Sequence, residues 1–136
     1  MGNAIFPRGN SSQYNKLVQE ILSGDVLWEN ENIADGFEAQ TIKYDTREYK
    51  RFEIVYIYDT ESPVTPENYI HSNAIISEKN VRYVSVMHTS DVCNHSRELT
   101  VTDDGFIFEN AYVTEAGQSK SKAMVPIKII GYKYWL

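Results

Sequence analysis

The segment YKRFEIVYIYD, residues 49–59, decides the fold class of this chain. Side chains of a β-strand alternate between its two faces, so Phe52 and Ile54 are expected on one face. Val55 and Ile57 then fall on the other face, which makes both faces of the second half apolar. A half-solvated strand would keep one polar face, so this segment predicts a strand in the middle of a sandwich or at a subunit interface.

Strand-like stretches flank this segment on both sides. They are DVLWEN (25–30), EAQTIKY (38–44), YIHSNAIIS (69–77), NVRYVSVMH (80–88), RELTVT (97–102), GFIFENAYV (105–113) and AMVPIKIIGYKYWL (123–136). The turn sequence Asp103-Asp104-Gly105 predicts a tight hairpin, and Pro126, which cannot donate to a sheet ladder, is expected on an edge or at a bulge. Seven or eight strands without intervening helices predict a mainly β fold, an antiparallel, jelly-roll-like β-sandwich.

One amphipathic helix is predicted ahead of the strands. It would begin at Ser11 or Ser12, both good N-cap residues, and end at Gly24. The apolar residues that follow the spacing of one helical face are Tyr14, Leu17, Val18, Ile21 and Leu22. Because an isolated helix of this length is marginal in water, that face must pack on this domain or on copies of itself.

Residues 1–10 show no periodic pattern of apolar residues, and Ile5 and Phe6 are the large apolar side chains that could anchor this segment. We interpret this segment as an arm that becomes ordered when something receives it. The chain is therefore divided into two parts. Residues 1–24 form an N-terminal arm and a helix for assembly or attachment, and residues 25–136 form the β-sandwich domain.

The charge balance disfavours nucleic acid as a partner. The 136 residues include 19 acidic and 13 basic ones, and the formal charge of -6 has the wrong sign for neutralising phosphates. The single cysteine cannot close an internal disulfide, so folding in cytosol is compatible with the sequence. No stretch approaches the roughly 20 apolar residues that a spanning helix needs, so we expect no membrane insertion.

The stretch HTSDVCNH, residues 88–95, has the composition of a metal site. It contains His88, Asp91, Cys93 and His95. In one strand His88 would point opposite to the other three, and there is no second pair of Cys or His ligands, so we interpret the stretch as a polar connection between a strand ending at Met87 and one beginning near Glu98. Nothing marks an oxyanion hole for a cysteine nucleophile, so we expect no catalytic site, no metal and no cofactor. The alternative, a cysteine or metal hydrolase, requires these four side chains to meet in one pocket.

The ten tyrosines and two tryptophans are the compositional anomaly of the chain. Tyr132, Tyr134 and Trp135 at the end of the last strand are expected to lie against a neighbouring subunit. A second hypothesis assigns a binding module that recognises a host-surface glycan or protein through loops 30–37, 60–68 and 88–96. The candidate stacking residues for such a ligand are Trp28, Tyr69 and Tyr112.

Two groups of residues resemble virion proteins of tailed bacteriophages. PRGNSSQYNKLVQEILSG (7–24) resembles the N-terminal segment of head fibre and related fibre proteins, in which a Pro-x-Gly-x-Ser-x-Gln-Tyr-x-x-Leu-Val pattern opens a short helix. The stretches VLWEN, GFEAQTIKYD and VPIKIIGYK are similar to a β-domain of minor structural proteins from phages and prophages of Gram-positive gut bacteria. The chain departs from that pattern after its Leu-Trp pair, where Glu29-Asn30-Glu31-Asn32 replaces Asn-Pro-Ser/Thr.

The resemblance implies a structural role in the virion, after synthesis in the host cytoplasm. The expected protein is a head fibre, decoration or tail fibre or tip component, and a homotrimer attached to other virion proteins through its N-terminal segment. The residues expected to mediate assembly are Ile5, Phe6, Tyr14, Leu17, Val18, Ile21, Leu22, Tyr132, Tyr134 and Trp135.

Overall fold

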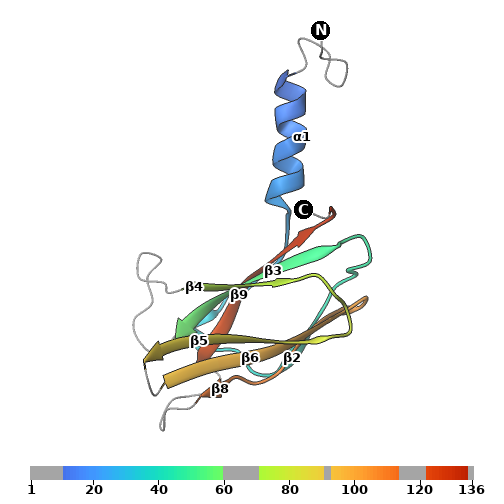
Figure 1. Cartoon of the computed structure of the whole chain (residues 1–136). Helices are drawn as coiled ribbons and strands as arrows, with labels where there is room; N and C mark the ends of the chain where they lie inside the picture. Colours follow the sequence, from blue (N-terminus) through green and yellow to red (C-terminus); the bar gives the residue numbers. More distant parts are fainter. Residues whose placement is uncertain (1–10, 60–70, 91–92, 114–121, 135–136) are drawn as a thin grey trace.

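The computed structural model describes residues 11–59, 71–90, 93–113 and 122–134, which form one helix followed by an antiparallel β-sandwich (Figure 1). The elements in chain order are α1 (Ser11–Ser23), β1 (Asp25–Glu29), the 3-10 helix η1 (Ile33–Asp35), β2 (Gln40–Lys43), β3 (Arg51–Asp59), β4 (His71–Ile76), β5 (Arg82–Ser90), β6 (Cys93–Thr102), β7 (Gly105–Phe108), β8 (Tyr112–Val113) and β9 (Ala123–Tyr132). The predicted mainly β fold is therefore confirmed, and η1 is an addition to it.

The strands form two sheets that pack face to face. The four-stranded sheet has the order β1-β9-β3-β4, and the five-stranded sheet has the order β2-β7-β6-β5, with β8 pairing to β6. The pair β1–β9 joins the first and last strands of the domain, and β3–β9 and β2–β7 are also long-range pairs, whereas β3–β4, β5–β6 and β6–β7 follow one another in sequence. The two ends of the domain thus close onto each other.

The strand β3 occupies the interior position that its apolar faces predicted. It pairs with β9 on one side and with β4 on the other. Phe52 and Ile54 point into the core, and Val55 on the opposite face is only 7% exposed. The absence of a solvated face in the second half of this sequence therefore reflects burial on both sides of the sheet.

Aromatic rings fill the space between the two sheets. Phe52 of the four-stranded sheet meets Phe106 of the five-stranded sheet edge to face, with ring centroids 5.4 Å apart. Phe37, which lies after η1, packs in the same way on Phe108 at 5.2 Å and on Trp28 at 5.7 Å. Offset and edge-to-face ring pairs of this kind add to the stability that burial of the rings provides.

A buried arginine ties the two sheets together. Arg97 of β6 is 1% exposed, and its guanidinium donates hydrogen bonds to the carbonyl oxygens of Met124 (2.8 Å), Glu109 (2.6 Å) and Ala123 (3.0 Å). Its Cζ lies 5.4 Å from the centroid of the Phe37 ring. Because Met124 and Ala123 belong to β9, the side chain crosses the core and fixes β6 to the other sheet.

Two local predictions about turns and bulges are confirmed. The Asp103-Asp104 turn joins β6 to β7, with Thr102 paired to Gly105. Gly105 has φ +149, and a Cβ there would lie 2.1 Å from the carbonyl oxygen of Ile42, so the position requires glycine. Pro126 lies beside a bulge in the ladder between β3 and β9, although β9 is an interior strand and not an edge.

The interpretation of residues 88–95 as a plain connection is wrong. β5 continues to Ser90, and β6 begins at Cys93, so most of the stretch belongs to the two strands of a hairpin. The register pairs His88 with Asn94 and Met87 with His95. The strand ladder extends through polar residues here because backbone pairing, unlike burial of side chains, does not depend on their hydrophobicity.

Candidate functional site

The helix α1 stands off one end of the sandwich, at the end where β9 also finishes (Figure 1). The hydroxyl of Ser23 donates to the carbonyl oxygen of Gln19 in the last turn, and the helix then stops at Gly24, whose φ is +68. Among the described side chains of α1, Val18 alone is half-buried and the others are exposed. The sandwich therefore does not cover this helix.

On the predicted apolar face of the helix, three of the described side chains are exposed to solvent. Tyr14 is 38% exposed, Leu17 is 49% exposed and Leu22 is 54% exposed. We call Tyr14, Leu17, Val18, Ile21 and Leu22 the helix stripe. The side chain of Ile21 lies outside the described part of the chain, as do Ile5 and Phe6, so their predicted contribution to assembly stays a prediction.

Gly24 fixes where the helix leaves the sandwich. A Cβ at this position would lie 2.8 Å from the carbonyl oxygen of Gly131, from Cγ2 of Ile130 and from Cε1 of Tyr132. Ile130 and Tyr132 point to the outer face of the four-stranded sheet, because their partners Glu53 and Arg51 alternate with the core residue Phe52. The close approach of the backbone to this sheet therefore requires glycine, and the helix begins its exit on the outer face.

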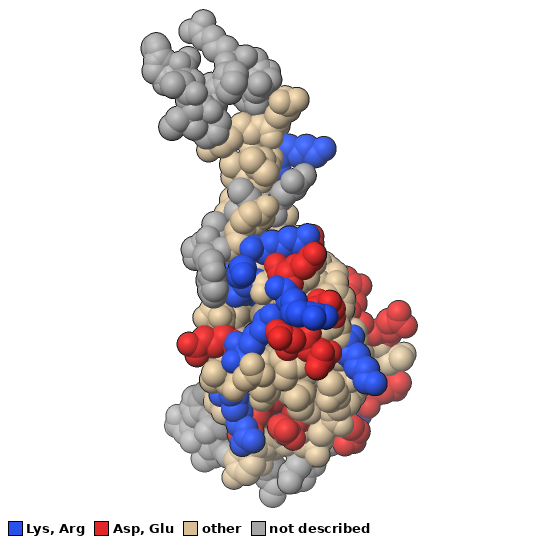
Figure 2. All heavy atoms as spheres, turned by 90° about the vertical axis from the view of Figure 1, so that its right-hand side faces the viewer, with Lys and Arg blue, Asp and Glu red and all other residues tan. Residues whose placement is uncertain are grey.

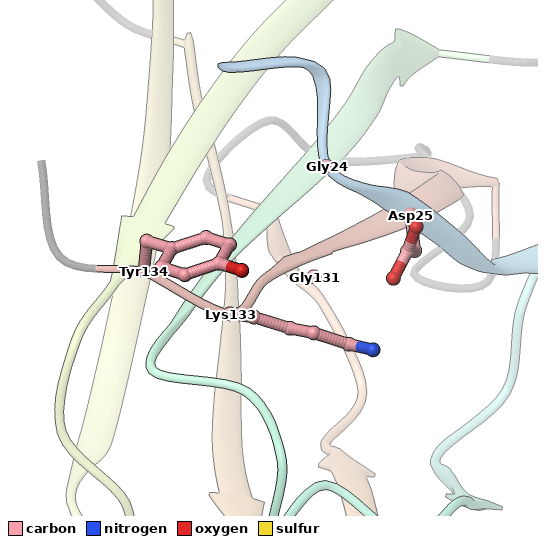
Figure 3. A pocket seen from close by; sticks show the side chains of 5 residues that line it. All are labelled: Gly24, Asp25, Gly131, Lys133 and Tyr134. Atoms are coloured by element: carbon pink, nitrogen blue, oxygen red, sulfur yellow. The ribbon is translucent and has the colours of Figure 1, made fainter. Parts of the chain in front are cut away.

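A small hollow lies at the base of the helix (Figure 3). Its volume is about 200 Å³, and it is lined by Gly24, Asp25, Gly131, Lys133 and Tyr134. Figure 3 shows the carboxylate of Asp25, the ammonium of Lys133 and the ring of Tyr134 arranged around Gly131. Tyr134, one of the predicted assembly residues, is 51% exposed and presents its ring at the rim.

The polar groups around this hollow are already engaged with the chain itself. The hydroxyl of Tyr49 donates to Oδ2 of Asp25 at 3.0 Å, and Lys133 Nζ lies 3.7 Å from the Glu48 carboxylate. Burial, followed by the hydrogen bond to Asp25, raises the pKa of the Tyr49 hydroxyl. Tyr49 is therefore a neutral donor at physiological pH, and the arrangement serves for contact more readily than for proton transfer.

The outer face of the four-stranded sheet carries an ordered polar network. The guanidinium of Arg51 lies 4.1 Å over the ring of Tyr132, whose hydroxyl donates to Oε1 of Glu53 at 3.0 Å. Asn73 Nδ2 donates to the other oxygen of Glu53 at 2.5 Å. Burial and then the Glu53 hydrogen bond raise the pKa of Tyr132. Tyr132 is only 8% exposed, so most of its ring is already covered within its own chain. Its predicted role in assembly stays a prediction.

Apolar side chains surround this network. Val26 is 55% exposed and Ile75 is 54% exposed. The strand registers place Val26 beside Ile130, Ile130 beside Glu53, and Glu53 beside Ile75 in one row across all four strands. Val26 and Ile75 were not predicted as surface contacts from the sequence, although the adjacent isoleucines at 75 and 76 place one apolar side chain on each face of β4.

The outer face of the five-stranded sheet is also partly apolar. Val84 and Val86 are 53% and 56% exposed, and Tyr112 is 63% exposed. A surface ion pair joins Arg82 Nε to Oε2 of Glu98 at 3.4 Å on the same face. On the side of the sandwich that Figure 2 presents, basic and acidic side chains are interspersed.

The three predicted stacking residues have different environments. Trp28 is half-buried and packs on the ring of Phe37, so it belongs to the edge of the core. Tyr69 lies outside the described residues, as does Trp135 among the predicted assembly residues. Tyr112 is the member of this group whose ring the structure presents to solvent.

The possible metal ligands of the described residues were the basis of the metal-site hypothesis, and their grouping can be compared with it. Within residues 11–59, 71–90, 93–113 and 122–134, no three His, Cys, Asp or Glu side chains are grouped so that they could hold a metal ion. His95 of β6 is completely buried. Asp91 lies outside the described residues, so the four-residue arrangement considered from the sequence stays untested.

Comparisons with protein-family models, with curated proteins and with solved structures give no match for this chain. Among the described residues, no helix combines the length and the apolar character needed to cross a membrane.

Proposed function

We propose that this chain is a structural subunit of a bacteriophage virion, a head fibre, decoration or tail fibre or tip component. It assembles as a homotrimer and is attached to other virion proteins through its N-terminal segment. The observation that carries the proposal is the open helix stripe, of which Leu17 and Leu22 are about half exposed on a helix that the sandwich does not cover. The resemblance of residues 7–24 to phage fibre proteins supplies the virion context.

A short helix with an exposed apolar face is not expected to be stable without partners. α1 has 13 residues, and helices this short are marginal in water without tertiary contacts. At 100° per residue, the five positions of the helix stripe span an arc of about 140°. A two-stranded coiled coil needs a narrower seam, so the width of the stripe favours a bundle of three helices or more.

The placement of the strand ends also supports attachment through the helix. β3 begins at Arg51 opposite Tyr132, near the base of the helix, and ends at Asp59 opposite Ala123. The strand ends Ser90 and Cys93 of the β5–β6 hairpin pair with each other at the end of the sandwich away from α1 (Figure 1). Attachment at the helix would therefore leave the opposite end of the sandwich facing outward.

Sedimentation equilibrium of the intact chain tests the proposal. The wild type should have three times the mass of the chain at micromolar concentration. Leu17→Glu with Leu22→Glu should give a monomer, because charges cannot be buried in a helix bundle. The matched control is Gln13→Glu with Gln19→Glu on the exposed polar side of the same helix, which should remain trimeric. A monomeric wild type would refute the proposed assembly, and antibody labelling of the parent particle would test its place in the virion.

A host-surface glycan is the second candidate partner, and one observation favours it. Tyr112 exposes 63% of its surface and lies beside Ser96 on the outer face of the five-stranded sheet. An exposed phenol ring beside a hydroxyl can stack on a sugar and hydrogen-bond to it. A glycan array should show signals that Tyr112→Ala removes, and an array without signals would leave the structural role alone.

A further inference from the structure

We infer that the outer face of the four-stranded sheet is a second contact surface between copies of this chain, continuous with the helix stripe. This inference rests on the proposed homotrimer and names where its β-domains meet. We call Val26, Glu53, Ile75 and Ile130 the outer row, since the strand registers place them side by side across β1, β9, β3 and β4. The occupant of this surface is a second copy.

The size of the helix shows why a second surface is needed. With 13 residues α1 is about 20 Å long, and its stripe consists of five side chains. A stable interface typically buries about 800 Å² on each partner. The helix stripe is too small to supply that area alone, so the sandwiches must contribute additional contact.

The continuity of the chain selects the face. Gly24, which ends the helix, lies directly on Ile130 and Tyr132 of the outer face. Val26 follows two residues later, pairs with Ile130 and is 55% exposed. Copies that are held together by their helices are therefore brought together next to the outer row and not next to the far sheet.

The carboxylate of Glu53 on this face already has hydrogen-bond partners within its own chain. Both carboxylate oxygens of Glu53 accept hydrogen bonds, one from Tyr132 at 3.0 Å and the other from Asn73 at 2.5 Å. Arg51 lies over the Tyr132 ring, and its Nε is buried without a hydrogen-bond partner among the described residues. Buried polar groups are tolerated when their hydrogen bonds are already made, so a neighbour can cover Glu53 of the outer row without leaving its carboxylate oxygens unsatisfied.

The outer face of the five-stranded sheet provides a comparison within the same molecule. Val84 and Val86 are exposed as much as Val26 and Ile75, at 53% and 56%. The ion pair of Arg82 and Glu98 on that face is loose, at 3.4 Å, and the Arg82 side chain is 68% exposed. This pair would lose its hydration if it were covered, and Gly24 does not lead the helix onto this sheet.

Arginine substitution on the two faces tests the inference. Val26→Arg and Ile75→Arg should each raise the trimer dissociation constant at least tenfold in sedimentation equilibrium, because a charge would enter the contact. Val84→Arg and Val86→Arg, at equally exposed positions of the other sheet, should leave it within twofold. Circular dichroism of all four variants establishes that the sandwich remains folded. Equal effects on the two sheets, or none on either, would overturn the inference.

A labelling experiment covers the case in which an arginine variant fails to fold. In a Cys93→Ser background, Ile75→Cys and Val84→Cys are labelled with a maleimide, first in the trimer and then in the Leu17→Glu, Leu22→Glu protein. Assembly should slow labelling at position 75 at least tenfold and leave the rate at position 84 unchanged. A monomeric wild type would remove the proposed function. A wild-type trimer with unprotected position 75 would remove this inference alone.

Discussion

The core of the sandwich contains a buried charge, whereas the helix exposes apolar side chains, and the two differ in whether the same chain provides their partners. In the core, Arg97 places a charge where only 1% of its surface reaches water, yet its guanidinium has three carbonyl partners from the same chain. On the helix, Leu17 and Leu22 are ordinary apolar side chains, yet about half of each remains in water. Arg97 finds its hydrogen-bond partners within the single chain, whereas Leu17 and Leu22 of the helix are left exposed by it.

The largest change in stability is expected from removing Arg97, whose hydrogen bonds join the two sheets. Arg97→Ala should lower the free energy of unfolding by about 3–5 kcal/mol, since it leaves the buried carbonyl oxygens of Met124 and Ala123 without this donor and opens a cavity between the sheets. Urea unfolding of the Leu17→Glu, Leu22→Glu protein measures this effect, because assembly then does not contribute to the transition. Arg47→Ala is the control, since Arg47 contacts only Asp45 at the surface. A loss no larger than that of the control would mean that the arginine does not hold the sheets together.

The position of Arg97 illustrates what the sequence can predict. Arg97 shares its strand parity with Leu99 and Val101, which are both buried, so strand alternation accounts for its position on the inner face, although it was not predicted there. Its acceptors could not be predicted, because Met124 and Ala123 are more than 25 residues away and are brought near by the β6–β9 packing. Side-chain parity is local information, and carbonyl partners across a core are not.

The same distinction explains the other successes and failures of prediction. The limits of the helix were predictable because capping and periodicity depend on neighbouring residues, and α1 ends one residue before Gly24 as expected. The pairing of β1 with β9 joins opposite ends of the chain, and nothing near either strand specifies it. The outer row was missed for this reason, because it exists only once four strands are placed in register.

A smaller effect should follow from changing the junction between the two parts. Gly24→Ala places a Cβ against Ile130 and Tyr132 at a φ of +68, so it should cost about 1 kcal/mol of stability and also redirect the helix. Gly36→Ala is the matched control, since Gly36 has φ +80 and lies far along the chain from the helix. Both variants should lose a similar amount of stability in urea. Only Gly24→Ala should weaken the trimer, by about tenfold in dissociation constant, and equal weakening in both would show that the helix direction is not important.

The smallest effect concerns the two tyrosines that border the outer face and the hollow. Burial, together with hydrogen bonds to Glu53 and Asp25, raises the pKa values of Tyr132 and Tyr49 above their ordinary value. A raised pKa in the folded state contributes stability that is fully present below the unfolded pKa of about 10 and is lost as the pH rises through the folded pKa. The monomeric variant should therefore keep a constant free energy of unfolding from pH 7 to 9 and lose stability above pH 10.

Phenylalanine substitutions show whether Tyr132 and Tyr49 cause this loss of stability above pH 10. Tyr132→Phe and Tyr49→Phe should each reduce the slope of stability against pH above pH 10, because the substituted ring cannot ionise. Tyr112→Phe, at a ring that is 63% exposed, should leave the slope unchanged. The double variant should retain a residual slope, since burial also raises the pKa of Tyr56 to about 12. If the slope of the double variant equalled that of the parent, the hydrogen bonds to Glu53 and Asp25 would not couple these rings to folding. The polar network of the outer face would then be a loose surface cluster, and covering it in an assembly would carry the full cost of removing its charges from water.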